Sequence, residues 1–373
     1  MPIVDLVNQT TLRRSARVLQ LEGLFDVPPS ERSEVTIHAS LPIEERDWNI
    51  GLICGASGCG KSTLARHLWP DQVQRTPTWS PDRAVVDDFP AHLSVKTVVQ
   101  YLSGVGFSSP PAWLRPFRHL STGEQFRVEV ARRLADAEND DSIVVVDEFS
   151  SVVDRQVAKV ASHTIAKAIR QRARRFVAVS CHLDIIDWLQ PDWVYRPDLQ
   201  RFEWRELQRR PSLDLTLWPV GRDAWPLFSP HHYLSRVLSS NATCFVAMHE
   251  GEPVAFTSYT PFPHPRVRDI RMGHRLVVLP DYQGIGIGGR LDDWLGHELW
   301  LTGYRYHNRV CHPAMIAYYE RSPRWRRIAA GFQTRGGDSV SNQGAFALRR
   351  HIRRISIRRV GVSYEYVERQ EAA

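Results

Sequence analysis

The residues with the clearest chemical potential lie in one stretch, residues 52–63, where an apolar run breaks into glycines and then into Lys-Ser-Thr. Glycines let a loop turn its backbone N–H groups toward an anion, a lysine reaches the outer phosphates of a nucleotide, and a serine hydroxyl can bind Mg²⁺. The flanking residues predict a strand before the loop and a helix after it. The alternative is an ordinary glycine-rich turn. We therefore expect a phosphate-binding loop made by Gly55, Gly58, Gly60, Lys61, Ser62 and Thr63.

Two acidic residues, Asp147 and Glu148, follow a second apolar run at residues 142–146. An acid at the end of a buried strand can hold the Mg²⁺ of a phosphate site together with Ser62, and the next carboxylate can polarise the attacking water. A third apolar run ends at His182, which taken alone is more often a structural residue. These strand ends predict a metal site and a catalytic base.

A further motif, Leu-Ser-Thr-Gly-Glu-Gln at residues 120–125, starts a predicted helix. Ser121 is a good N-cap and Glu124 stands three residues later, so the simplest interpretation is a capping box. The whole series closely resembles the nucleotide-binding domain of the ABC ATPase superfamily, because the phosphate loop, this motif, the two acids, Asp154 and the strand-end histidine occur in the order of that family.

That resemblance implies a role for each motif. Ser121 and Gly123 belong to the signature motif, Asp147 binds the metal, Glu148 is the catalytic base, Asp154 lies in the D-loop and His182 contacts the γ-phosphate. The ligands are then ATP and Mg²⁺. Since the signature motif of this family completes the ATP site of the opposite subunit, ATP is expected to produce a head-to-tail homodimer.

Departures from the family pattern narrow the class of ATPase. Thr122 replaces a glycine of the usual signature, and the Glu-Gln pair that follows makes the motif similar to that of DNA-repair and chromosome-maintenance ATPases. Only 59 residues separate Lys61 from Leu120, fewer than transporters of this superfamily generally need, which argues against transport. No Q-loop glutamine is evident, and Phe25 and Trp48 are both candidates for stacking on adenine.

A second unit of strand, glycine turn and helix lies at residues 275–299. Its turn offers backbone N–H groups to an anion but lacks the Lys-Ser pair of a phosphate loop. A predicted helix at residues 231–238 and a predicted hairpin, with strands at residues 243–249 and 253–259, come before it. This order argues against a dinucleotide fold, in which the glycine turn follows the first strand.

The order instead resembles the GNAT acyltransferase fold, whose Q/R-x-x-G-x-G/A motif is matched by Gln283, Gly286 and Gly288. The resemblance implies that this turn binds the pyrophosphate of acetyl-CoA, or of another acyl-CoA, and that the preceding strand splays to hold the pantetheine. The residues that would bind the acyl-CoA are Val277, Val278, Leu279, Gln283, Gly284, Gly286, Gly288 and Gly289.

The same family uses a tyrosine on the next helix to protonate the departing thiolate, and Tyr319 aligns with it, although tyrosines at this spacing are more often core residues. His312 stands where the family often has asparagine. A base is often placed on the strand before the glycine turn, where Asp269, His264 and His274 are in range. His274 lies closest and an imidazole titrates near neutral pH, but an exposed or hydrogen-bonded histidine is the alternative.

The chain of 373 residues is long enough for two domains with separate cores. We expect an ABC-type ATP-binding domain over residues 1–207 and a GNAT-like acyltransferase domain over residues 208–373. The fold class is then α/β, a P-loop NTPase domain followed by an α+β domain. Five cysteines without paired spacing indicate a reduced, cytoplasmic protein, and no window of about 18 apolar residues predicts a membrane span.

Positive charge is concentrated in the second half of the chain. Residues 201–373 hold 25 arginines and no lysine against 16 acidic residues, a net charge of +9, whereas the whole chain carries +7. Six of these arginines lie close together near the end, namely Arg349, Arg350, Arg353, Arg354, Arg358 and Arg359. They are suited to the phosphates of a nucleic acid, since arginine pairs bidentately with phosphate, or they form a solvated edge of the domain.

These observations favour an enzyme in which an ABC-type ATPase drives or gates acyl transfer from CoA to nucleic acid. Two alternatives stay open. In the first, the GNAT fold has lost catalysis and the protein is an ATP-switched nucleic-acid clamp. In the second, the acceptor is a protein or a small amine, and ATP only regulates access.

Overall fold

The computed structural model describes residues 3–11, 14–26, 32–138, 143–206, 214–232, 236–262, 267, 269–334 and 358–368. These residues belong to two compact units. The first comprises residues 1–105 and 115–210, and the second comprises residues 106–114 and 211–373. The second unit therefore includes a nine-residue segment from the middle of the first unit's sequence. Within the described part of the chain, no helix is long and apolar enough to cross a membrane.

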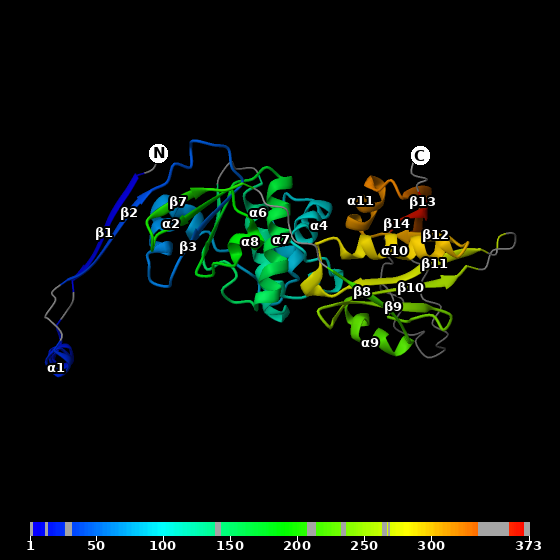
Figure 1. Cartoon of the computed structure of the whole chain (residues 1–373), viewed down its shortest axis with the longest axis horizontal. Coiled ribbons are helices and arrows are strands. Elements are labelled where there is room, and N and C mark those ends of the chain that lie inside the picture. The colour runs from blue at the N-terminus through cyan, green and yellow to red at the C-terminus, as the bar shows by residue number, and fades with distance from the viewer. Residues whose placement is uncertain are drawn as a thin grey trace, which may run out of the picture. The chain divides into compact units, whose positions relative to one another are not determined.

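The first unit is built on a five-stranded sheet in the order β4 (Val144–Val146), β5 (Phe176–Ser180), β3 (Ile50–Cys54), β6 (Trp193–Arg196) and β7 (Arg201–Trp204). β3 and β7 of this sheet are labelled in Figure 1. The first four strands are parallel and β7 is antiparallel to β6. β3 and β5 are buried along their whole length, which explains their continuous apolar sequences. Three predicted strands are therefore confirmed: β3 precedes the phosphate loop, β4 precedes Asp147 and Glu148, and β5 precedes His182.

Three predicted motifs lie at helix N-termini in this unit: the phosphate loop, the capping box and Asp154. α2 follows the phosphate loop, and α6 begins with the predicted capping box at Ser121, which is confirmed. Asp154 is the N-cap of α7 (Arg155–Gln171), and its carboxylate accepts a hydrogen bond from the backbone N–H three residues later. The helical segments are α2 (Lys61–Leu68), α3 (Pro70–Gln74), η1 (Val85–Asp88), α4 (Val95–Gly104), η2 (Phe117–His119), α6 (Thr122–Asp136), α7 (Arg155–Gln171) and α8 (Ile185–Leu189).

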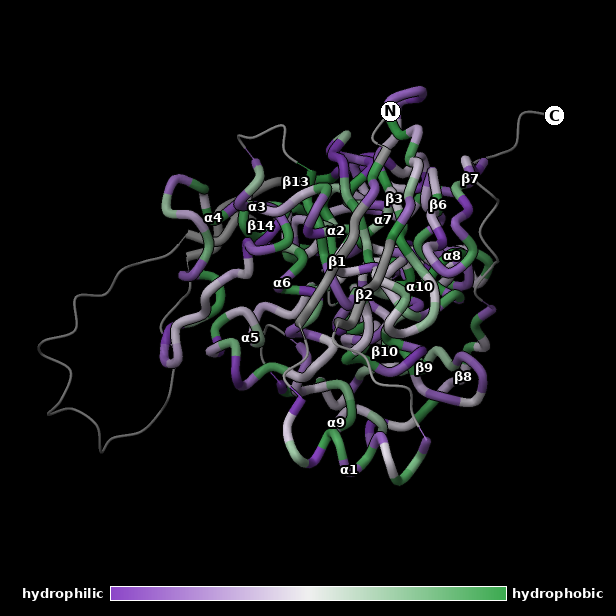
Figure 2. Tube along the Cα trace, turned by 90° about the vertical axis from the view of Figure 1, so that its left-hand side faces the viewer, coloured by the Kyte–Doolittle hydropathy of each residue, from purple (hydrophilic) through white to green (hydrophobic). Residues whose placement is uncertain are grey.

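In the N-terminal region, the apolar spacing of residues 16–21 predicts a strand, and this prediction is wrong. These residues form the helix α1 (Ala16–Phe25), because the Ser15 hydroxyl accepts the Val18 N–H and caps a helix. α1 joins the antiparallel strands β1 (Ile3–Thr11) and β2 (Arg32–Ser40). Its apolar residues, green in Figure 2, are largely exposed, because no residue of α1 is buried.

The second unit contains a seven-stranded sheet in the order β13 (Trp325–Thr334), β14 (Arg358–Tyr366), β12 (Arg305–Val310), β11 (Ile270–Val278), β10 (Glu252–Pro261), β9 (Thr243–His249) and β8 (Thr216–Val220). Only β11 and β12 pair in parallel. β9 and β10 form the predicted hairpin, which is confirmed. Its turn residues Glu250 and Gly251 have φ angles of 49° and 87°, the two left-handed positions of a tight hairpin turn.

One helix predicted in the second unit is wrong in its position. The helix expected at residues 231–238 is absent from the described residues 236–238, and helical turns occur earlier in the chain. Residues 236–239 instead lie beside β11, because Arg275 donates to the Val237 carbonyl and the Ser239 N–H donates to His274. The helical segments are α5 (Pro110–Trp113), η3 (Arg222–Ala224), α9 (Trp225–Phe228), η4 (Ser229–His231), η5 (Pro280–Tyr282), α10 (Ile287–Leu301) and α11 (Pro313–Arg321).

Candidate nucleotide and acyl-CoA sites

The phosphate loop connects β3 to α2 in the first unit. Gly58 and Gly60 have φ angles of 83° and 87°, which glycine adopts without strain. Gly60 also lacks room for a side chain, because a Cβ atom would lie 2.5 Å from Cδ1 of Ile37 on β2. The Lys61 ammonium is buried and donates to two carbonyl oxygens of the loop, at 2.6 and 3.0 Å. The lysine is thereby held in the curve of the loop.

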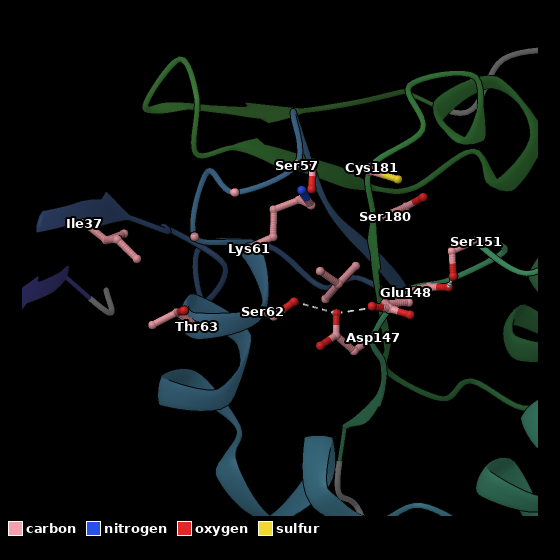
Figure 3. Close-up of a pocket in the computed structure, with 13 residues that line it drawn as sticks. Ile37, Ser57, Lys61, Ser62, Thr63, Asp147, Glu148, Ser151, Ser180 and Cys181 are labelled. Atoms are coloured by element: carbon pink, nitrogen blue, oxygen red, sulfur yellow. Dashed lines mark hydrogen bonds between the residues drawn. The ribbon is translucent and has the colours of Figure 1, made fainter. Parts of the chain in front are cut away.

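Ser62 and Asp147 point toward one another (Figure 3). The Ser62 hydroxyl donates to Oδ1 of Asp147 over 2.9 Å, and the same oxygen accepts the backbone N–H of Glu148, also at 2.9 Å. A carboxylate and a hydroxyl beside a phosphate loop suit Mg²⁺, which takes few protein ligands and completes its shell with phosphates and water. The two residues expected to bind the metal are adjacent although 85 positions separate them.

Both residues line a cavity of about 370 Å³, a size typical of ligand pockets. Glu148 lines it too and is exposed, with a φ angle of 52° that is uncommon for a residue other than glycine. Such backbone conformations concentrate at functional sites. The cavity is lined by Ile37, Ser57, Gly58, Gly60, Lys61, Ser62, Thr63, Asp147, Glu148, Ser151, Val179, Ser180 and Cys181.

His182 is anchored next to this cavity through Ser180. The Ser180 hydroxyl donates to the Phe149 carbonyl at 3.1 Å and accepts the His182 backbone N–H at 3.2 Å. Ser180 lines the cavity, whereas His182 lies two residues beyond it and does not. The contact of His182 with a γ-phosphate therefore stays a prediction.

The signature-like motif and Asp154 do not line the cavity of their own chain. Ser121 accepts the Glu124 N–H at 3.3 Å, and the Glu124 carboxylate accepts the Ser121 N–H at 2.9 Å. Ser121 and Thr122 are exposed at the N-terminus of α6, while Gly123 is buried. The motif is thus accessible from outside the chain at a helix N-terminus, where backbone N–H groups attract anions.

Trp48 does not stack on adenine in this fold, because it is a core residue. It is 8% exposed, packs edge-on against Trp193 at 5.4 Å between ring centroids and donates to the Ile43 carbonyl at 2.9 Å. Phe25 is exposed on α1. No residue of the described range 69–138 lines the cavity.

The glycine turn of the second unit connects β11 to α10. Gly284 and Gly286 have φ angles of 88° and 97°. Gly286 is the N-cap of α10, and a Cβ atom there would meet no atom within 4 Å. The first N–H groups of this 15-residue helix receive no side-chain cap, an arrangement suited to a pyrophosphate. Gly288 makes ordinary contacts, whereas a Cβ on Gly289 would lie 2.5 Å from the Tyr318 ring.

Gln283 uses its side chain inside the protein. It is 7% exposed, its Nε2 donates to the Val278 carbonyl at 2.9 Å and its Oε1 accepts the Ser108 N–H at 2.7 Å. Val277 is buried in the core, and the Leu279 N–H donates to the Val254 carbonyl of β10 at 2.9 Å. Sequence patterns do not reveal Ser108, because it stands 175 residues before its partner.

β11 and β12 separate at the place where an acyl-CoA is expected. Their parallel register covers only Ile270–Met272 against Arg305–His307. At the next position, Gly273 packs so closely against β12 that a Cβ atom would lie 2.8 Å from Asn308 and from the Tyr306 hydroxyl. The two strands therefore begin to separate at Gly273, next to the side chains of Tyr306 and Asn308 on β12.

A buried polar cluster occupies this point. Asp292 of α10 is 0% exposed and accepts hydrogen bonds from Tyr306 at 3.3 Å, from Asn308 at 3.0 Å and from Tyr319. All three donors are neutral, and burial raises the pKa of Asp292 to about 7 against the lowering effect of these bonds. The sequence signal for Asp292 was its position on the same helix face as the apolar residue Leu295.

Tyr319 is part of this cluster and is 1% exposed. Its ring lies 4.3 Å from that of Trp325, and burial together with Asp292 raises its pKa well above the ordinary value. Its neighbour Tyr318 is only half-buried and donates to Asp293 at 2.6 Å. Tyr319 therefore keeps its proton at neutral pH, and its role as the acid stays a prediction.

His274 is held by backbone contacts. Its Nε2 accepts the Ser239 N–H at 3.0 Å, and burial followed by the adjacent Arg275 lowers its pKa to about 4. The lone pair that a base would use is already occupied, which disfavours the predicted role. His274 has no partner in the β10–β11 register, since Ser258 pairs with Arg275 and Tyr259 pairs with Gly273. It is the extra residue of a β-bulge, which sets its position.

The arginine cluster lies mostly outside the described residues. Arg349, Arg350, Arg353 and Arg354 fall in that part of the chain, so the expected phosphate contacts stay a prediction. Arg358 and Arg359 lie on β14, where their backbone pairs with the end of β13.

The family model of the acetyltransferase (GNAT) domain matches residues 240–322. No curated protein matches the sequence. The match spans β9 to α11 and contains the glycine turn, the separating strands and the buried cluster. This part of the chain is therefore a GNAT domain.

Solved structures resemble parts of the chain at low sequence identity. The ribosomal-protein-S18-alanine N-acetyltransferase from Escherichia coli is 16% identical, covers 43% of this chain and 99% of its own, with a TM-score of 0.30. A Bacillus subtilis acetyltransferase in complex with CoA is 14% identical, covers 42% and 100%, with a TM-score of 0.30. A dimeric bacterial ABC transporter cassette is 16% identical, covers 46% and 92%, with a TM-score of 0.36.

Proposed function

Residues 240–322 form a GNAT acetyltransferase domain that follows an ABC-type P-loop unit in the sequence, and from this we propose that the chain is an ATP-dependent acyltransferase. Its donor is acetyl-CoA or another acyl-CoA, and its acceptor is an amine of a nucleic acid. The observation that carries the proposal is the open turn at Gly286, which precedes an uncapped helix N-terminus and follows a strand that separates from its neighbour.

In the first unit, the proposed reaction is ATP hydrolysis. The loop N–H groups and Lys61 bind the phosphates, and Ser62 and Asp147 hold Mg²⁺, which when bound neutralises phosphate charge. Glu148 takes a proton from the attacking water. The exposed N-terminus of α6 at Ser121 is placed against the ATP of a second copy, which gives a head-to-tail homodimer.

In the second unit, the acceptor nitrogen attacks the thioester carbonyl carbon. A nitrogen–carbon bond forms as the carbon–sulfur bond breaks, and the thiolate takes a proton from Tyr319. The proton that the amine releases passes to water, and a proton from water restores the Tyr319 hydroxyl. Asn308 links Tyr319 to the backbone of Gly273, because its amide lies 2.9 Å from the Tyr319 hydroxyl and packs on that glycine. The acid then lies beside the strand that holds the thioester.

The test of the donor is calorimetric titration of CoA into the full chain. Gly286→Val should abolish binding, because a side chain fills the space for the pyrophosphate, while ATP turnover continues. Gly303→Val is the matched control, since Gly303 also has a positive φ angle (80°), also meets no atom within 4 Å and follows the opposite end of α10. Binding that survives in Gly286→Val, or is absent from the wild type, would reject the donor assignment.

The test of the acceptor is mass spectrometry of nucleic acid from cells with and without the protein. The charge of +9 over residues 201–373 supports an anionic acceptor. A base carrying an added acyl mass is the expected result. Unmodified nucleic acid with CoA thiol release would indicate a protein or small-amine acceptor. ATP-dependent nucleic-acid binding without thiol release would indicate the clamp.

A further inference from the structure

The segment Gly106–Leu114 belongs to the second unit although the first unit's sequence surrounds it. It follows α4, whose last turn is fixed in the first unit where the Val105 carbonyl accepts the Thr164 hydroxyl at 2.9 Å. Most of its larger side chains are buried, including Phe107 (1% exposed) and Trp113 (7%). The chain therefore passes into the second unit, is packed there, and returns toward the signature-like motif.

The first contact of this segment is with the acyl-CoA turn. The Ser108 N–H donates to Gln283 at 2.7 Å, and the same side chain donates to the Val278 carbonyl at the end of β11. Gln283 stands three residues before Gly286, the N-cap of α10. Because buried amide groups need partners, removing the Ser108 donor leaves Gln283 incompletely bonded and frees the turn to shift.

The second contact is with the start of α11. The Trp113 ring lies 6.2 Å from that of His312, and the Trp113 indole donates to the Phe107 carbonyl at 2.9 Å, which fixes its orientation. His312 is the N-cap of α11, where its Nδ1 accepts the Ala314 N–H at 3.2 Å. Burial lowers the pKa of His312 to about 4, against the effect of a hydrogen bond with the Ser108 backbone. The segment thus contacts both ends of the proposed transfer site.

We infer that residues 106–114 position the acyl-CoA turn and the helix that carries Tyr319, with Ser108 and Trp113 as positioning residues, and that they couple acyl-CoA binding to the nucleotide state of the first unit. The inference rests on the proposed function. Its physical basis is chain continuity: Leu114 lies seven residues before Ser121, so a displacement of α6 when ATP joins two copies acts on the segment through a short connection. Binding coupling is reciprocal, so CoA must affect nucleotide affinity by the same factor.

The experiment uses the full chain and calorimetric titration of CoA with and without Mg²⁺ and a non-hydrolysable ATP analogue. In the wild type the nucleotide should change CoA affinity by about fivefold or more. Trp113→Ala should bind both ligands but lose this difference, and Trp113→Phe, which keeps an aromatic ring on His312, should restore most of it. Trp218→Ala is the control, because Trp218 is 60% exposed on β8 of the same unit.

Each outcome is decisive. CoA binding that the nucleotide does not change, or a Trp113→Ala protein that keeps the whole nucleotide effect, would overturn the coupling and leave the proposed function intact. Absence of CoA binding in the wild type would reject the proposed function and the inference with it. If Trp113→Ala does not fold, Trp113→Leu replaces it: the larger apolar side chain fills more of the buried space but has no ring to pack on His312, so it should also abolish the nucleotide effect.

Discussion

The nucleotide site and the acyl-CoA site are assembled in different ways. The nucleotide cavity is lined almost entirely by three short stretches, residues 57–63, 147–151 and 179–181, each next to the end of a parallel strand. The acyl-CoA region combines a glycine turn with a segment 175 residues earlier and with a buried cluster from two helices and β12. A phosphate site is made mainly by backbone geometry, whereas the transfer site depends on buried side-chain networks, which are sensitive to every partner.

The comparison can first be tested at Glu148, where the largest effect is expected. Glu148→Gln removes the carboxylate that accepts the proton of water, so phosphate release should slow about 10²- to 10⁴-fold while ATP binding is kept. Light scattering in saturating Mg-ATP should then show a dimer. Glu129→Gln, at a partly exposed glutamate of α6, should behave as the wild type. Wild-type turnover by Glu148→Gln would refute the role, and a persistent monomer would refute the dimer.

The corresponding test of the acyl-CoA site is Tyr319→Phe. Loss of the proton donor should lower the rate of thiol release about 100-fold, with CoA affinity unchanged. Tyr318→Phe is the matched neighbour, since its hydroxyl donates to Asp293 and not to the buried cluster. If Tyr318→Phe loses the rate and Tyr319→Phe keeps it, the acid is Tyr318.

A smaller effect is expected on the pH dependence of stability, because the buried cluster of the second unit contains Asp292. Asp292 has a pKa of about 7 when folded and a reference value of 3.8, so the folded state holds one more proton between these values. Stability should therefore fall as pH rises from about 4 to 7, by roughly 4 kcal/mol in total, and Asp292→Asn should flatten this dependence. Urea unfolding at pH 5 and 8 measures it, with exposed Asp223→Asn as control. An unchanged slope in Asp292→Asn would show that another group is responsible.

Much of the first unit was predictable because its signals are local. A phosphate loop needs glycines at positive φ angles followed at once by lysine and serine, and an apolar run ending in acids indicates a buried parallel strand. The capping box at Ser121 is likewise complete within four residues. One prediction there failed through a local conflict: at residues 16–21 the apolar spacing favoured a strand, while the Ser15 cap decided for a helix. A distant contact excluded Trp48 as a candidate for stacking on adenine, because Trp193, 145 residues later in the chain, packs on it in the core.

The sequence by itself determined the fold class, the glycine turns and the strand-end acids, since each depends on residues adjacent in the chain. Only the tertiary structure decided that Gln283 binds Ser108, that Asp292 joins Tyr319 and Asn308 in one buried cluster, and that residues 106–114 belong to the second unit. Those contacts link positions far apart in the chain. The burial that makes them matter, by removing water as an alternative hydrogen-bond partner, exists only after the chain has folded.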